Sequence, residues 1–326
     1  MRGIILNPVL GKEFRSRMRT WKSPLVISIY LGVLSLITLG YYWTRQGPIT
    51  YTGFGPEVGP QMYVMLAVFQ LLLVSFVTPA FTAGVISGER ERQTLDLLVC
   101  TRLSATSIVL SKLLASVSYI LLLVVASLPV FGAVYFFGGV RLSEIGQVFV
   151  VYLMTALTFG AVGVFCSTVF KRTQVSVVIT YIIVFFFLIG TAAVAVFMAS
   201  ISMRSGSYPS TPFIAYLNPV VALFSTFPGQ LGQGLFLREF QFIFGGPVPV
   251  GVPPGSGGAA LPSVGLQPWQ YNFIGDAVII VVLLGISIQL ITPVGRFSWV
   301  KRIRHRKRMP VTVEIGTADA RERHAD

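Results

Sequence analysis

Charged side chains are scarce in this chain, and their scarcity excludes a water-soluble globular protein. Asp, Glu, Lys and Arg make up 11% of the 326 residues, whereas hydrophobic residues make up 54%. Soluble domains carry about 25% charged residues, because polar side chains must cover the surface that faces water. The mean hydropathy of +0.76 comes from long uncharged runs such as 175–197, which is the pattern of membrane spans rather than of a large soluble core.

Histidine and cysteine are nearly absent, which excludes several kinds of site. The two histidines, His305 and His324, lie in the polar C-terminal stretch. The spans therefore offer no imidazole base for an intramembrane serine protease and no set of ligands for zinc. The two cysteines, Cys100 and Cys166, fall where we expect the cytoplasm, so they indicate no disulfide.

Acidic residues are almost missing from the apolar runs. We expect Asp276 at the edge of a span and Glu239 in an outer segment, whereas ion-coupled carriers keep carboxylates near the middle of the membrane. The chain also lacks a G-x-x-x-x-G-K-[ST] phosphate loop, since GKE at 11–13 has neither the upstream glycine nor the hydroxyl. Energy for any transport must therefore come from a source other than these residues.

Basic residues outnumber acidic ones, 25 to 12, yet their positions indicate a membrane rather than nucleic acid as the partner. Twenty-one of the 25 lie in four segments: the N-terminus, residues 87–112, Lys171 with Arg172, and the tail from Arg296. Basic residues concentrate in the cytoplasmic parts of membrane proteins, so we expect these segments, and both chain ends, in the cytoplasm. There they would contact lipid headgroups.

Six apolar stretches are long enough to cross the bilayer, which takes about 20 residues of helix. Their expected ranges are about 24–43, 61–86, 113–137, 147–170, 174–199 and 276–295. Pro79 and Pro129 fall within the second and third stretches and are expected to kink them. The sequence therefore predicts an all-α integral membrane protein with a six-helix transmembrane domain over 24–296.

The outer segment 200–275, before the last span, changes in composition along its length. PVPVGVPPGSGG at 247–258 is typical of an extended or flexible loop, whereas 213–244 is strongly apolar but broken by Pro and Gly. Two interpretations stay open for 213–244: short outer re-entrant helices, or a subdomain on the outer membrane surface. A seventh span would place the basic tail outside, against the charge rule.

Both terminal segments are expected at the cytoplasmic face. In residues 1–23, Phe14, Met18 and Trp21 recur at helical spacing among basic side chains, which predicts an amphipathic helix in the membrane interface. The tail 297–326 contains KRIRHRKR at 301–308 and ends in a polar stretch that we expect to be disordered.

The stretch 86–116 is the most charged between spans. Charges of alternating sign come first, at Glu89, Arg90, Glu91 and Arg92. Apolar side chains then recur at i, i+3 and i+4, at Leu95, Leu98 and Val99. This pattern predicts a short helix parallel to the membrane, in which Asp96 can pair with Arg92, and Ser104 can cap the next helix. Such a surface suits either docking into a groove on a soluble partner or resting on lipid.

The order of motifs in this stretch resembles that of the membrane subunits of ATP-binding cassette exporters of the type-2 class, which is the polysaccharide and drug exporter class. In that family the second span leads into E-R-E, T-L-[DE]-x-L-L, a [TS]-P-[LV]-S turn and a helix bearing a Lys. This chain has Glu89-Arg90-Glu91, Thr94-Leu95-Asp96-Leu97-Leu98, Thr101-Arg102-Leu103-Ser104 and Lys112, with Arg102 in place of the usual proline. LNPVVALF at 217–224 is similar to the family's Asn-Pro segment, and the likeness extends over about residues 1–300.

The resemblance implies roles for two groups of residues. A coupling helix would contact a separate nucleotide-binding ATPase through Glu89, Arg90, Glu91, Arg92, Thr94, Leu95, Asp96, Leu98 and Val99. An N-terminal interfacial connecting helix would pack beside it and carry Lys12, Glu13, Arg15 and Arg19. ATP and Mg²⁺ would bind to the partner ATPase, and this chain would hold no cofactor of its own.

The resemblance also implies a function: the permease subunit of an ATP-driven exporter in the prokaryotic plasma (inner) membrane, without an ATPase site of its own. Two permease chains, identical or paralogous, would join two ATPase chains, with the substrate path between the permease chains. Two other hypotheses stay open. One is a membrane scaffold or sensor of the same fold that moves no solute; the other is an unrelated secondary carrier or channel, which the scarcity of buried carboxylates disfavours. The residues do not identify the substrate.

Overall fold

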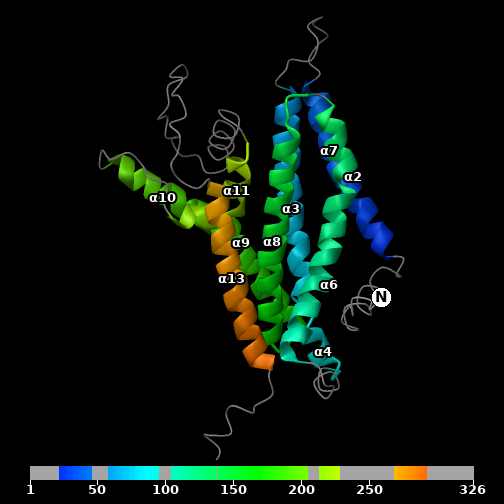
Figure 1. The fold of residues 1–326 in the computed structure, drawn as a ribbon, viewed down its shortest axis with the longest axis vertical. Coiled ribbons are helices and arrows are strands. Elements are labelled where there is room, and N and C mark those ends of the chain that lie inside the picture. Colours follow the sequence, from blue (N-terminus) through cyan, green and yellow to red (C-terminus); the bar gives the residue numbers. More distant parts are fainter. Residues whose placement is uncertain are drawn as a thin grey trace, which may run out of the picture. The chain divides into compact units, whose positions relative to one another are not determined.

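The computed structural model describes residues 22–45, 58–94, 104–136, 138–204, 213–227 and 268–291, and within these ranges all regular structure is helical. In chain order the elements are α2 (Lys22–Arg45), α3 (Val58–Thr82), α4 (Ser87–Glu91), α6 (Ala105–Ala126), α7 (Leu128–Tyr135), α8 (Leu142–Val169), α9 (Thr173–Phe185), η1 (Phe186–Gly190), α10 (Thr191–Arg204), η2 (Phe213–Leu217), α11 (Pro219–Ser225) and α13 (Pro268–Ile291) (Figure 1). All of them belong to one compact unit, Met1–Ile291.

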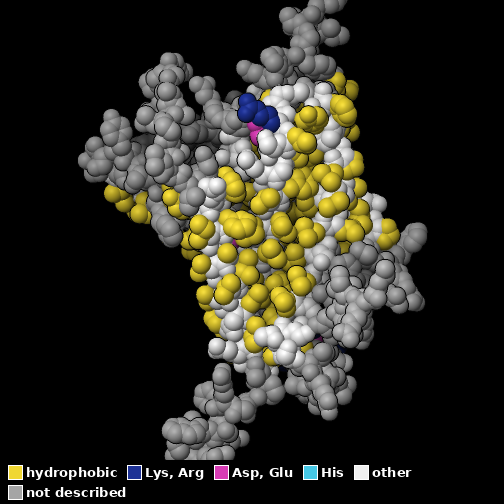
Figure 2. Space-filling model, viewed as in Figure 1, with side chains coloured by type: hydrophobic (Ala, Val, Ile, Leu, Met, Phe, Trp, Pro, Cys, Tyr) yellow, Lys and Arg dark blue, Asp and Glu magenta, His cyan; other side chains and the backbone are white. Residues whose placement is uncertain are grey.

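Among the described residues, six helical stretches are long and apolar enough to cross a membrane. They are Ser23–Trp43, Gly59–Glu91, Ala105–Tyr135, Leu142–Val169, Thr173–Val194 and Trp269–Ile291, and each overlaps one predicted span. Hydrophobic side chains cover most of the visible described surface (Figure 2). Leu36 and Val281, for example, are 73% and 71% exposed. An apolar surface of this extent suits contact with lipid rather than water.

Helix α8 lies at the centre of the bundle. It packs against α3, α6, α9 and α13 (Figure 1), and 72% of its span is buried, against 17% for the spans of α2 and α13. Small residues allow this close packing. A Cβ atom added to Gly163 would overlap the Thr82 hydroxyl of α3 and would lie 2.8 Å from Thr82 Cβ, so only glycine fits there without displacing α3.

The third span is divided by a break, as Pro129 predicts. α6 ends at Ala126, α7 begins at Leu128, and Pro129 lies in the first turn of α7, where a missing backbone N–H is tolerated. At the other end of α6 the predicted cap is also confirmed, because the Ser104 hydroxyl accepts a hydrogen bond from Ser107 N.

A π-helical turn, η1, interrupts the fifth span, and the predicted Asn-Pro segment binds to it. Asn218 caps α11 by accepting a hydrogen bond from Val220 N at 2.8 Å. Its amide nitrogen donates to the Leu188 carbonyl of η1 at 2.9 Å and to Thr191 Oγ1 at 3.0 Å. The wider π-helical turn leaves backbone groups to be satisfied by neighbours, and Asn218 satisfies one of them.

The last span begins earlier than predicted. α13 starts at Pro268, so Asp276 lies inside the span and not at its edge. Asp276 is 3% exposed, and Asn272, one turn earlier, is buried and donates to the Tyr216 carbonyl at 2.8 Å. A polar side chain can enter a span where it faces other helices instead of lipid, and for this reason the charge of Asp276 does not mark the boundary.

Several predicted segments lie outside the described residues. These are residues 12–21 of the predicted connecting helix, with Lys12, Glu13, Arg15 and Arg19, the loop 247–258, and the tail 297–326. Of the apolar stretch 213–244, the structure describes η2 and α11, which pack against α13. Ala222 and Leu223 of α11 are buried.

Candidate functional site: the α3–α4 elbow

Helix α3 does not run straight into α4; a turn at residues 83–86, here called the elbow, separates them. Side chains from other helices satisfy the backbone groups that this break frees. Ser167 of α8 is the main one, because its hydroxyl oxygen accepts hydrogen bonds from both Ile86 N and Ser87 N at 2.8 Å. Ser167 is fully buried, so these bonds are shielded from water and hold the elbow against α8.

Helix α9 holds the elbow from another side. The Ser176 hydroxyl donates to the Ala83 carbonyl at 2.6 Å. Gly84 faces the start of α9 so closely that an added Cβ would lie 3.0 Å from Thr173 Cγ2. The absence of a side chain at Gly84 therefore lets the elbow reach α9.

A buried ion pair joins α4 to α6. Lys112 Nζ lies 2.6 Å from Glu89 Oε1; the lysine side chain is 2% exposed and the glutamate side chain 26%. A lysine this deeply buried needs a carboxylate partner, because an unpaired charge in a low-dielectric site is strongly unfavourable. The second oxygen, Glu89 Oε2, is buried and has no hydrogen-bond partner within the described part of the chain.

The neighbouring charges of α4 reach α8 and α9. Glu91 accepts two hydrogen bonds from Thr173, one from the backbone N and one from the hydroxyl, each 2.8 Å long. Glu91 thereby caps the N-terminus of α9, where negative charge is favoured and where Arg172 supplies no side-chain cap. Arg90 donates from Nη1 to the Thr168 carbonyl near the end of α8 at 3.2 Å.

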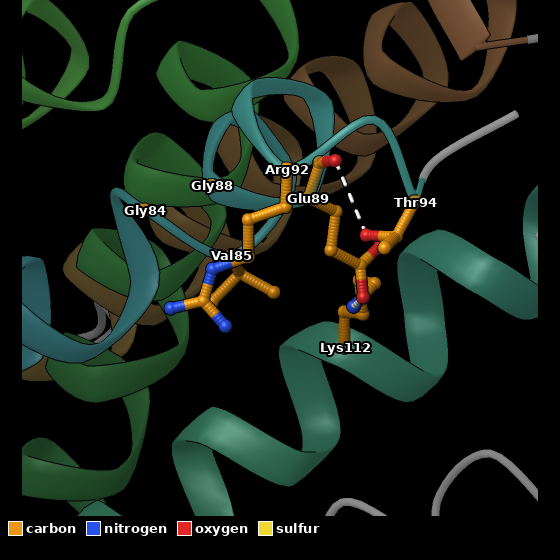
Figure 3. Close-up of a pocket in the computed structure, with 7 residues that line it drawn as sticks. All are labelled: Gly84, Val85, Gly88, Glu89, Arg92, Thr94 and Lys112. Carbon is orange, nitrogen blue, oxygen red and sulfur yellow. Dashed lines mark hydrogen bonds and ion pairs between the residues drawn. The ribbon is translucent and has the colours of Figure 1, made fainter.

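A polar pocket of about 320 Å³ lies beside the elbow (Figure 3). Its walls are Gly84, Val85, Gly88, Glu89, Arg92, Thr94 and Lys112. Figure 3 shows the side chains of Glu89 and Lys112 pointing toward each other in the pocket lining. Thr94 lies beside them, and its hydroxyl donates to the Glu89 backbone carbonyl. Charged and hydroxyl groups of this kind suit a polar group of a partner better than an apolar ligand. The described residues contain no group of three His, Cys, Asp or Glu able to hold a metal ion.

The sequence model of a known family covers this whole arrangement. The family described as ABC-2 family transporter protein matches residues 47–233, which is more than half of the chain. The chain belongs to the ABC-2 transporter family. It is a multi-pass membrane protein, the membrane component of an ABC-2 transporter. The matched region includes the elbow and the residues of α6, α8 and α9 that bind it. A comparison with the curated proteins finds no match.

In this ABC-2 membrane protein, the charged residues of α4 that were predicted to contact a partner bind other helices of the same chain. Glu89, Arg90 and Glu91 bind Lys112, the Thr168 carbonyl and Thr173, respectively. Arg92 and Thr94 line the pocket. The alternating charges therefore position α4 against three other helices of the bundle.

The predicted helix over 89–99 is interrupted. α4 ends at Glu91, and Gln93 has a φ of +58°, a left-handed conformation that ends helices. Thr94 then bonds back to the Glu89 carbonyl through its backbone N at 3.0 Å and its hydroxyl at 3.2 Å. Of the remaining predicted contact residues, Leu95, Asp96, Leu98 and Val99 lie outside the described residues.

Sequence reasoning missed the hydroxyl residues that hold the elbow. Ser167, Thr173 and Ser176 were not predicted to act there, because hydroxyls in spans usually bond to their own helix. One signal could have found them: only residues 170–172 separate α8 from α9, so hydroxyls near this connection lie at the same end of the bundle as α4.

Proposed function

We propose that the chain is the permease subunit of an ATP-driven exporter, and that α4 and the stretch after it receive the movement of a separate nucleotide-binding ATPase. ATP and Mg²⁺ bind to that ATPase, since this chain has no phosphate loop. A second permease chain, identical or paralogous, completes the substrate path. In this arrangement the elbow end of the bundle and both chain ends face the cytoplasm of a prokaryotic cell.

The observation that carries the proposal is the set of contacts that join α4 to three other spans. Glu89 binds α6, Arg90 binds α8, and Glu91 binds α9. An ATPase can shift a permease only by binding one of its conformations more tightly than the other. A short helix with polar contacts to three spans can pass such a preference into the bundle, because displacing it must move those spans or break their contacts.

The partner is tested by purifying the chain from its native host in mild detergent and identifying what accompanies it by mass spectrometry. We expect a stoichiometric protein with a phosphate-binding loop. If none is recovered while other complexes of the same membrane survive the purification, the exporter assignment is wrong, and a stand-alone carrier replaces it. If an ATPase is recovered but the reconstituted complex moves no solute under ATP, the chain is a scaffold or sensor.

The contact surface is tested with Leu98→Glu. Placing a charge on an apolar interface anchor costs about 2 kcal/mol or more, about a 30-fold loss of affinity. We expect Leu98→Glu to lose the ATPase during purification. The matched control is Leu142→Glu, since Leu142 is 74% exposed at the opposite end of α8 from the elbow. Equal recovery of the ATPase by both variants would place the contact elsewhere.

A further inference from the structure

Asp276 is a buried acid in the interior of the bundle, away from the elbow. It lies two turns into α13 and is 3% exposed, although α13 is among the least buried helices. The side chain that hydrogen-bonds to it is Thr158 of α8, which is 2% exposed and lies near the middle of its helix. An ionisable residue at this depth is a candidate functional site, because lipid and packed helices both disfavour a charge.

The other buried polar residues on α13 have their own partners. Asn272 donates to the Tyr216 carbonyl, and the Ser287 hydroxyl donates to the Leu283 carbonyl, both at 2.8 Å. On the opposite face, Val278 and Val281 are exposed. The polar side of α13 therefore faces the bundle, and Asp276 is the acid on that side.

Thr158 is shared between Asp276 and its own helix. The Thr158 hydroxyl has one proton, and the Met154 carbonyl accepts it at 3.0 Å. A hydroxyl that already donates to its own helix stabilises a carboxylate less than a donor free of such a bond would. The burial of Asp276 is therefore not offset by a strong donor from Thr158.

No cation among the described residues compensates a charge on Asp276. The helices packed against α13 are α6, α8, α11 and η2. On α8 the charged residue is Glu144, in the first turn, where it accepts from Arg141 N. On α6 it is Lys112, which pairs with Glu89. α11 and η2 carry no Asp, Glu, Lys, Arg or His, and Tyr216 of η2 stacks on Tyr271 of α13.

We propose that Asp276 is a proton-binding site: its carboxyl holds a proton while α8 and α13 are packed as in this structure and releases it when water reaches the interface between them. The packed state then binds one more proton than the opened state. By linkage, the packed state loses stability relative to the opened state as the pH rises through the range in which Asp276 ionises. This site is independent of the ATPase contact proposed above.

The test is infrared difference spectroscopy on the full chain in lipid nanodiscs at neutral pH, comparing the wild type with Asp276→Asn. A protonated carboxyl has a carbonyl stretch distinct from that of a carboxylate. We expect the wild type to show one such band that Asp276→Asn lacks, and Glu144→Gln to retain it. A wild type without this band, or a band that disappears in Glu144→Gln but not in Asp276→Asn, would overturn the proposal.

Thr158→Val provides a second arm that keeps Asp276 in place, should Asp276→Asn fail to fold. This change removes the hydroxyl that hydrogen-bonds to Asp276, so the band should shift to the position of a carboxyl without that partner. Thr155→Val is the matched control, because Thr155 is equally buried on α8 and its hydroxyl bonds to Val151 O. A band unmoved by Thr158→Val, or moved equally by Thr155→Val, would contradict the assigned contact.

Discussion

Two buried tyrosine hydroxyls in the apolar interior differ in whether they have a hydrogen-bond partner. Tyr152 and Tyr63 are both almost completely buried. The Tyr152 hydroxyl donates to the Ala67 carbonyl at 2.9 Å, whereas the Tyr63 hydroxyl has no hydrogen-bond partner in the described ranges. The Tyr63 ring packs edge-on against Phe131 and Phe227, so its contribution to packing does not depend on the hydroxyl.

This contrast predicts opposite effects of the same substitution. Tyr152→Phe should lower the free energy of unfolding by about 1 kcal/mol, because a buried hydrogen bond is lost and the Ala67 carbonyl keeps only its helical partner. Tyr63→Phe should be neutral or stabilising by up to about 1–3 kcal/mol, since it removes a buried group that has no partner. Thermal unfolding in one detergent measures both. A loss for Tyr63→Phe equal to that for Tyr152→Phe would mean that the Tyr63 hydroxyl is bonded.

At the same scale, the residues of the site were only partly predictable. The sequence identified Glu89, Arg90 and Glu91 as important, but not what they touch, because their partners lie about 20 to 80 residues away along the chain. Ser104 was predictable as a cap, since capping depends on neighbours in sequence.

Whole helices were predicted better than their ends, because length and apolarity decide whether a segment spans a bilayer. All six predicted spans overlap long apolar helices. The predicted start of the last span was wrong because the charge of Asp276 was taken as its boundary. Asn272 and Asp276 have partners on other elements, and the local sequence pattern does not reveal them. Pro129 made the break at Ser127 predictable. The π-helical turn η1 has no proline or glycine at its start, so the sequence did not mark it.

Close packing of α3 on α8 makes a prediction about glycine. Gly163→Ala should destabilise the bundle by about 1–3 kcal/mol, because the added methyl group overlaps Thr82 and lies 3.2 Å from Ala83 N at the elbow. Gly146→Ala is the matched control on the same helix, since nothing lies within 4 Å of an added Cβ there and alanine favours a helix. Unfolding temperatures of the two variants test this. Equal temperatures would show that α3 and α8 are packed less tightly than described.

At the scale of the whole molecule, the orientation in the membrane is a prediction from the basic residues. A cysteine at position 255 should react with an impermeant thiol reagent from outside intact cells, and a cysteine at position 307 only after the membrane is opened. Both positions lie outside the described residues, so the prediction depends on the charge rule alone. The two cysteines are compared in a variant that lacks Cys100 and Cys166. Reaction of position 307 from outside intact cells would contradict the predicted orientation.

The family was recognisable from the order of the motifs near 89–112, and the match over 47–233 confirms it. What that order could not predict is that the acidic and basic residues of α4 bind three other spans. The proposed role of α4 in coupling depends on whether those contacts transmit ATP-driven movement.

The most direct measurement is the labelling rate of a single cysteine at position 136, which is 89% exposed just after α7, in the purified complex with and without ATP and vanadate. In the chain that carries Phe136→Cys and lacks Cys100 and Cys166, but is otherwise unchanged, we expect the rate to change with ATP. In Glu91→Ala, which removes both bonds to Thr173, ATP hydrolysis should continue while most of that change is lost. An unchanged ATP-dependent response in Glu91→Ala would contradict the role of α4 in coupling.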